Sequence, residues 1–173
     1  MTRIRPLAVV LLGTVIAVAS AVARDLPRAD ATRLEARLQA LSKFGANPEG
    51  GVSRVAFSDA DIAGREYVAS LMREAGLTVR VDASGNLIGR RAGSNDTLPP
   101  IVLGSHTDSV PGGGNYDGNV GVLGAIEVVQ LMNERKLRTR HPIEVVNFAD
   151  EEGAMVGSRG MAGDLTLEAL AER

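Results

Sequence analysis

The chain has 173 residues, of which 45% are hydrophobic and 23% are charged, and this composition is typical of one globular domain. The formal net charge is −2 and no basic patch is interleaved with aromatic residues, so nucleic acid is not expected as a partner. Cysteine is absent, which excludes disulfide bonds, cysteine-ligated metal sites and a thiol nucleophile.

Residues 1–23 are expected to form an apolar signal helix or a membrane anchor. Arg3 and Arg5 precede an uncharged apolar run that ends in small residues just before Arg24, which is the layout of a secretory signal peptide. Cleavage would give an exported protein, either periplasmic or secreted. The run is slightly shorter than the roughly 20 residues of a comfortable membrane span, and membrane anchoring through residues 4–23 is the alternative.

The next part of the chain predicts two helices and a pair of strands. Leucines recur at helical spacing from Leu34 to Leu41, and Ser58 has the position of an N-cap for a second helix that ends near Gly76. Two short apolar segments then flank the turn-forming sequence Asp-Ala-Ser-Gly. The expected strands cover residues 77–81 and 86–90.

The second half predicts a strand, a helix and a strand. Residues 101–104 have the pattern of a short buried strand, residues 120–131 of an apolar helix that continues to about Arg135, and residues 143–148 of another apolar strand. This order predicts a right-handed crossover with the two strands parallel. The expected fold class is therefore α/β, with a mainly parallel central sheet flanked by helices.

Polar side chains follow these two strands. His106 comes just after the first strand, and Glu151 and Glu152 come just after the second. Asp117 immediately precedes the crossover helix. Because parallel strands present their carboxyl ends at one edge of a sheet, all four side chains are expected to converge there.

These residue types fit metal-dependent hydrolysis. Imidazole and carboxylate ligands without sulfur suit zinc, manganese, cobalt or nickel, and one or two such ions lower the pKa of bound water enough to supply a nucleophile. Asp117 can bridge two ions, while Glu152 binds one and Glu151 moves a proton from the water to the leaving nitrogen. Asp108, two residues beyond His106, is placed to orient that ligand.

Other interpretations of these residues stay open. A histidine after a strand often has only a structural role, and a Glu-Glu pair can be a solvated acidic turn. The Pro-Gly-Gly-Gly run at residues 111–114 lacks the Gly-Lys-Ser/Thr of a phosphate loop and is expected to be a tight turn near Asp117.

His141, at the far end of a strand and roughly 20 Å from the site, is expected to be structural. Arg159 is a candidate either for binding an anionic substrate or for capping the following segment.

Short motifs surround these residues. The first group comprises Gly-Ser-His-Thr-Asp-Ser-Val at 104–110, Gly-Gly-Asn-Tyr-Asp-Gly at 113–118 and Gly-Val-Leu-Gly at 121–124. The second comprises Arg-His-Pro-Ile-Glu-Val-Val at 140–146, Glu-Glu-Gly at 151–153 and Gly-Ser-Arg at 157–159. Together with Gly-Gly-Val-Ser-Arg at 50–54 and Ala-Ser-Gly-Asn-Leu at 83–87, they resemble the dinuclear amidohydrolases that include N-carbamoyl-L-amino-acid hydrolase, beta-ureidopropionase and allantoate amidohydrolase.

The resemblance implies a zinc-peptidase-like catalytic domain that binds two divalent metal ions and acts on a small ureido compound. It implies His106 and Glu152 as ligands of different metals, Asp117 as the bridge and Glu151 as the general base. Relatives also carry two further histidine ligands and an inserted lid domain with dimer contacts, which these 173 residues do not contain. Residues 24–173 are therefore expected to be the N-terminal portion of the catalytic domain, with the oligomeric state left open.

Three functions are compatible with the resemblance. The first is metal-dependent hydrolysis of a non-peptide linear amide C–N bond, in an N-carbamoyl amino acid or a related ureido compound. The alternative is a catalytically inactive fragment of such an enzyme, and a lesser alternative is a metallopeptidase of the same superfamily. Many relatives carry an Arg-Phe pair after the Glu-Glu-Gly motif, whereas here Ala-Met-Val leads directly to Gly157, and this shorter loop bears on substrate preference.

Overall fold

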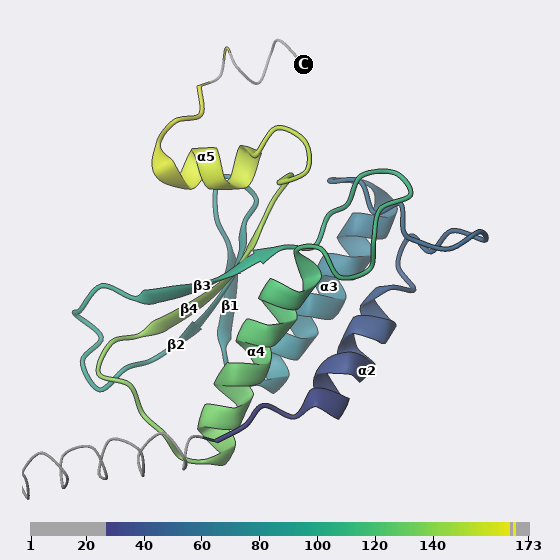
Figure 1. The fold of residues 1–173 in the computed structure, drawn as a ribbon. Helices are drawn as coiled ribbons and strands as arrows, with labels where there is room; N and C mark the ends of the chain where they lie inside the picture. Colours follow the sequence, from purple (N-terminus) through teal and green to yellow (C-terminus); the bar gives the residue numbers. More distant parts are fainter. Residues whose placement is uncertain (1–26, 167, 169–173) are drawn as a thin grey trace, which may run out of the picture.

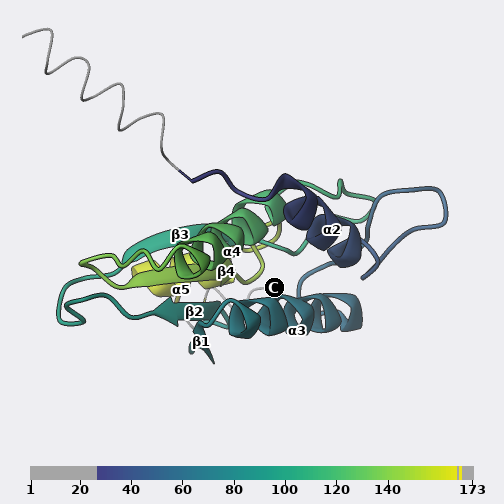
Figure 2. The same cartoon turned by 90° about the horizontal axis from the view of Figure 1, so that it is seen from below.

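The computed structural model describes residues 27–166 and residue 168, so the expected signal segment lies outside the described residues. Helices α2 (Ala31–Leu41), α3 (Asp59–Glu74) and α4 (Asn119–Glu134) lie along one side of a four-stranded sheet, and the short helix α5 (Val156–Ala162) follows the last strand (Figures 1 and 2). Within this described part, every helix is too short or too polar to span a bilayer.

The three predicted helices are present, and the first two of them, α2 and α3, begin at polar caps. The Asp30 side chain accepts the Arg33 N–H at 3.0 Å at the start of α2, and Ser58 Oγ accepts the Asp61 N–H at 3.3 Å at the start of α3. One hydrophobic core then joins α2, α3 and α4 to the sheet. Its fully buried members include Leu41, Val68, Met72, Val122, Leu123, Ile126, Val129 and Val145.

The sheet has the order β1-β2-β4-β3, formed by β1 (Thr78–Val81), β2 (Leu87–Arg91), β3 (Ile101–His106) and β4 (Ile143–Phe148). The predicted parallel pairing of the two strands around α4 is confirmed, since β3 pairs with β4 in parallel. The prediction of a mainly parallel sheet is wrong, because β1 with β2 and β2 with β4 are antiparallel. The short turn between β1 and β2 makes these two strands antiparallel neighbours. Strand β2 also runs antiparallel to β4, next to which it lies.

Strand β3 lies at an edge of the described sheet rather than in its interior. The prediction of a buried strand is wrong here, because Ile101 is 45% exposed and Val102 is 50% exposed. The backbone of β3 nevertheless lies very close to the backbone of β4. A Cβ at Gly104, where φ is 149°, would lie 1.9 Å from the Val146 carbonyl oxygen of β4, and only glycine permits that approach.

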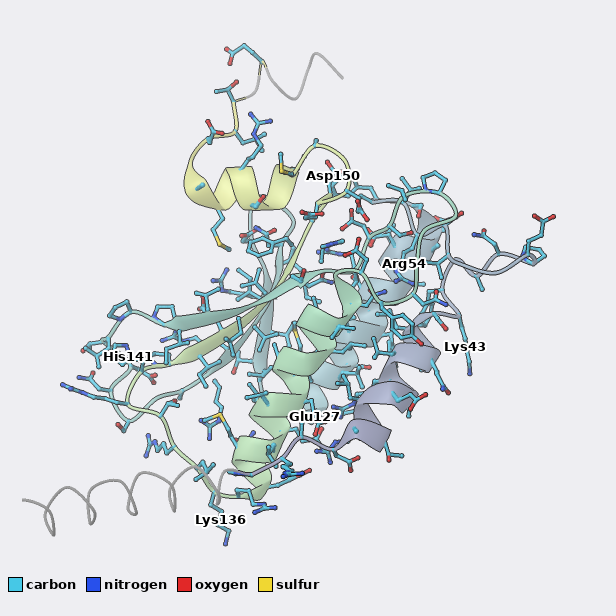
Figure 3. The ribbon with its side chains drawn as sticks, in the orientation of Figure 1. Lys43, Arg54, Glu127, Lys136, His141 and Asp150 are labelled. Atoms are coloured by element: carbon cyan, nitrogen blue, oxygen red, sulfur yellow. The ribbon has the colours of Figure 1, made fainter. Side chains whose placement is uncertain are left out.

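A buried ion cluster connects α2 to α4. The Glu127 side chain points out of the otherwise apolar α4 and is only 1% exposed. Its carboxylate accepts hydrogen bonds from Arg33 Nε at 2.7 Å, Arg37 Nη1 at 3.2 Å and the Asp30 N–H at 3.0 Å. Figure 3 shows Glu127 between the two helices. Several charged and polar donors thus replace the water that this carboxylate loses on folding.

Candidate metal centre

Strands β3 and β4 end side by side, and the candidate site lies at this end of the sheet. His106 is paired in register with Phe148, so the turn after β4 brings Glu151 and Glu152 to the end of β3. The turn starts at Asp150, whose φ of 56° is left-handed and whose Oδ2 accepts the Ala154 N–H at 2.9 Å. Backbone geometry therefore turns the acidic pair back toward His106.

Three side chains that the sequence singled out come together here. One ligand atom each from His106, Asp117 and Glu152 can be chosen so that all lie within 4.8 Å of one another. His106 is buried, Glu152 is half-buried and Asp117 is exposed, so the cluster opens to solvent on one side. Residues from β3, from the loop before α4 and from the turn after β4 thus share one small region.

Hydrogen bonding determines which nitrogen of His106 is available to a ligand. Nδ1 lies 3.1 Å from the Asp108 carbonyl oxygen, and because a carbonyl can only accept, Nδ1 must carry the proton. Nε2 then faces the carboxylates, with Glu151 Oε2 at 3.4 Å. This is the arrangement in which a backbone oxygen holds an imidazole for metal binding through its other nitrogen.

The buried Asp108 carboxylate contacts two residues of the site, His106 and Glu152. Its Oδ2 accepts the Glu152 N–H at 3.1 Å, while its buried Oδ1 lies 3.6 Å from His106 Nδ1 and has no hydrogen-bond partner among the described residues. The Asp108 carboxylate raises the pKa of His106 to about 9, more than burial of the ring lowers it. Burial raises the pKa of Asp108, but contacts with His106 and with the backbone N–H groups of Glu152 and Glu151 outweigh it and hold that pKa below its usual value.

The loop that carries Asp117 passes directly over His106. Gly118 follows Asp117 with a φ of 63°, and a Cβ at this position would lie 2.5 Å from His106 Nε2. Any side chain here would therefore combine backbone strain with a collision against the imidazole. The glycine lets the Asp117 loop approach the ligand nitrogen and start α4 at the next residue.

The other sequence candidates lie apart from this cluster. His141 Nδ1 lies 2.8 Å from the Pro99 carbonyl oxygen. Because a carbonyl oxygen can only accept, Nδ1 donates this hydrogen bond. Figure 3 shows His141 at the end of the sheet opposite Asp150. Arg159 lies on α5 and donates to the Asp164 carbonyl oxygen at 3.1 Å, just beyond the end of that helix. The Arg159 side chain thus contacts the segment that follows α5.

Two residues that organise the site were missed as functional residues at the level of sequence. Asn86 is fully buried, accepts the Ala149 N–H at 3.1 Å and donates to the Gly157 carbonyl at 2.9 Å, so it joins the end of β4 to α5. Arg54 is also fully buried and contacts the loop after β3. Both lie in the motifs at 50–54 and 83–87 on which the resemblance rests, but the spacing of these motifs does not predict the hydrogen-bond partners of the two side chains.

The donor set fits a divalent transition metal. One imidazole nitrogen and two carboxylate oxygens suit zinc, manganese, cobalt or nickel, and His106 already has its other nitrogen fixed by a hydrogen bond. Within the described residues the cluster has three members, so the remaining coordination positions are left for water, substrate or another polypeptide.

Comparison with known proteins gives consistent results. A family profile described as Peptidase family M28 matches residues 86–170. Over 143 residues the chain is 53% identical to an N-carbamoyl-L-amino acid amidohydrolase of Geobacillus stearothermophilus, an alignment that covers 80% of this chain and 35% of that protein. It is 42% identical over 147 residues to a ureidoglycolate hydrolase of Arabidopsis thaliana, covering 82% and 31% of the two chains.

The fold is also found among solved structures. A crystal structure of a hydantoinase/carbamoylase family amidase from Burkholderia ambifaria superimposes with a TM-score of 0.80 at 41% identity, covering 83% of this chain and 37% of that one. The chain therefore spans about a third of the length of the relatives it matches. Over that third, the sequence and the fold of this chain are similar to those of the carbamoylase-type amidohydrolases.

Proposed function

We propose that this chain contributes the metal site of an amidohydrolase that cleaves a C–N bond in an N-carbamoyl amino acid or a related ureido compound. The observation that carries the proposal is the cluster of donors from His106, Asp117 and Glu152 within 4.8 Å. The 53% identity to an N-carbamoyl-L-amino acid amidohydrolase supports the substrate class. We propose two divalent ions, chosen from zinc, manganese, cobalt and nickel, with Asp117 as the bridge.

The residues of the chain have separate roles in this reaction. A bound divalent metal lowers the pKa of a water molecule and polarises the ureido carbonyl. Asp108 holds His106 and the Glu152 backbone in place, and Glu151 takes the proton from the attacking water and returns it to the leaving nitrogen. Water adds to the carbonyl carbon and one C–N bond breaks. Cleavage at the amino-acid nitrogen releases the free amino acid and carbamic acid, and the carbamic acid decomposes to ammonia and carbon dioxide.

The test is hydrolysis by metal-loaded protein. The purified chain is incubated with each of the four metals and with N-carbamoyl-L-amino acids, both alone and together with the unmatched part of the Geobacillus stearothermophilus relative as a separate polypeptide. We expect release of free amino acid that requires metal and stops on chelation. Bound metal without release in either format would favour the catalytically inactive fragment, and folded protein that binds no metal would contradict the proposal.

A metallopeptidase is the second candidate. The matching profile is described as a peptidase family, and a hydrolytic metal site can cleave a peptide bond as well as a ureido bond. Dipeptides included in the same assay separate the two candidates. Cleavage of dipeptides without cleavage of carbamoyl amino acids would favour the peptidase.

We also propose that the protein is exported, as a periplasmic or secreted protein, through removal of residues 1–23. The basic start, the apolar run and the small residues before Arg24 support this. We propose a small ureido compound as the binding partner and do not propose binding of nucleic acid. N-terminal sequencing of the mature protein is expected to begin at Arg24, whereas an intact N-terminus in the membrane fraction would favour the anchor through residues 4–23.

A further inference from the structure

Arg54 is the largest of the fully buried side chains in the described part of the chain, and it lies at the same end of the fold as Asp150 (Figure 3). Its guanidinium makes four hydrogen bonds to neutral oxygens. Nε donates to the Thr107 carbonyl at 2.5 Å, and Nη2 donates to Asn119 Oδ1 at 3.1 Å. Nη1 donates to the carbonyl of Leu41, the last residue of α2, at 3.0 Å and to that of Phe44, just after the helix, at 2.8 Å. One side chain thus joins three separate segments.

Two of these segments carry the metal-site residues. Thr107 lies between His106 and Asp108, so the bond from Nε holds the chain between the ligand and the carboxylate that orients it. The backbone adds to this contact, because the Arg54 N–H donates to Ser109 Oγ at 3.0 Å and the Arg54 carbonyl accepts the Ser109 N–H at 2.9 Å. Residues 107–109 are therefore attached to Arg54 at both ends.

The other segment is the loop that presents Asp117. Asn119, which accepts from Arg54, donates through Nδ2 to the Asn115 carbonyl at 2.9 Å. Its own N–H donates to the Asp117 carbonyl at 2.6 Å. Asn119 thus spans the loop on both sides of Asp117. Through Asn119, the guanidinium connects the position of Asp117 to the position of His106.

The environment of Arg54 is unusual for a residue that only fills the core. None of its hydrogen-bond acceptors is a carboxylate, and burial lowers the pKa of its guanidinium, although the charges of Asp61 and Asp108 oppose this. A buried cation is unfavourable unless all of its donors are satisfied, and only the planar arginine fork reaches several acceptors at once. Helix α3 makes room for it, because a Cβ at Gly64 would lie 2.8 Å from Arg54 Cδ.

We propose that Arg54 is a positioning residue of the metal centre, whose guanidinium holds the 107–109 segment and the 115–119 loop at the separation that lets His106 and Asp117 share a metal site. This inference rests on the proposed function, since it assigns a role in that same site. It predicts that Arg54 affects the geometry of the ligands beyond its contribution to stability.

The test compares two buried arginines. Arg54→Lys keeps the charge but cannot reach all three segments, and Arg37→Lys makes the same change in the ion cluster between α2 and α4, away from the site. We expect Arg54→Lys to weaken zinc binding by about 10- to 100-fold, the usual effect of losing a residue that orients metal ligands. Arg37→Lys should bind zinc like the wild type. Affinity is measured by competition with a chromophoric chelator at a temperature where each variant is folded.

Hydrogen exchange gives a second readout that needs no metal. In Arg54→Lys, the backbone N–H groups of Ser109, Asn119 and Glu152 should exchange faster, while those between β2 and β4 keep wild-type protection. Wild-type exchange at the three sites together with wild-type zinc affinity would overturn the inference, as would an equal loss throughout the sheet in both lysine variants. If the wild type binds no zinc, the proposed function fails, and the exchange result alone decides the role of Arg54.

A third variant reaches Arg54 without changing it. Gly64→Ala usually favours a helix by about 1 kcal/mol, but here the added methyl group presses on Arg54 Cδ, which cannot move away while the guanidinium holds four hydrogen bonds. We expect weaker zinc binding and faster exchange at Ser109 in this variant as well. If Arg54→Lys does not fold, Gly64→Ala decides the question, and wild-type behaviour in both readouts would overturn the inference.

Discussion

Replacing Glu151 with glutamine is expected to lower the turnover of an N-carbamoyl amino acid by about 10²- to 10⁴-fold, the range typical for removal of a general acid–base group. Glu151 lies beside the donor cluster, 3.4 Å from His106 Nε2, yet its side chain is 43% exposed and free to meet a substrate. Glutamine has nearly the same shape but cannot accept the proton. Steady-state rates of amino acid release, with metal content measured on the same samples, provide the test.

Two further variants make the Glu151 result specific. Glu152→Gln changes the neighbouring carboxylate and should lower metal content as well as turnover, because Glu152 is a member of the donor cluster. Glu74→Gln alters an exposed glutamate at the end of α3 and should leave both quantities unchanged. A Glu151→Gln protein that keeps wild-type turnover with full metal content would show that another group moves the proton.

Replacing Glu127 with alanine is expected to lower the free energy of unfolding by about 3 kcal/mol. Breaking a buried ion pair typically has an effect of about 3–5 kcal/mol, and the lower end applies here because Arg33 remains partly solvated. The change removes the acceptor that Arg33, Arg37 and the Asp30 N–H share, and leaves Arg33 with Glu134 and Arg37 with Gln130. Urea unfolding followed by circular dichroism measures the loss.

The control for Glu127 lies on the rim of the same cluster. Glu134 also pairs with Arg33, at 2.8 Å, but its side chain is 44% exposed. Glu134→Ala should therefore have a far smaller effect, since water replaces the lost partner. Equal losses for the two alanine variants would mean that burial of the carboxylate does not determine the strength of this contact.

The same cluster predicts how stability depends on pH. Burial raises the pKa of Glu127, but its hydrogen bonds with Arg33 and the Asp30 N–H and the charges of Arg33 and Arg37 outweigh burial, so the pKa lies below the ordinary 4.5. A carboxyl with a depressed folded pKa stabilises the protein fully above its unfolded pKa and loses this contribution as the pH falls through the folded value. The stability gap between wild type and Glu127→Gln should be constant above pH 4.5 and narrow below it.

Periodicity and end signals were sufficient to predict most of the elements of the fold. The N-cap at Ser58 and the strand at residues 143–148 agree with the structure, and the crossover rule correctly made β3 and β4 parallel. The order of the strands could not be derived, because the insertion of β2 beside β4 depends on packing between distant segments. The exposure of Val102 was missed because a short apolar run has the same pattern at an edge as in an interior.

The ligand side chains were easier to predict than the residues that hold them. His106 and Glu152 follow strands whose ends meet, so chain order alone indicates their proximity. Arg54 and Glu127 carry no comparable signal. The partners of Arg54 are mostly backbone carbonyls, which every residue offers, and the partners of Glu127 lie on a helix far away in the sequence.

The parallel pairing of β4 with β3 makes the geometry of the donor cluster depend on contacts between segments that are far apart in the sequence. A slip of one residue between β3 and β4 would displace the acidic turn by about 3.3 Å and turn alternate side chains to the wrong face. No short peptide cut from this sequence can therefore reproduce the centre. If the proposed site takes up cobalt, the colour of the ion would report, during refolding, the moment at which β3 and β4 have paired in the correct register.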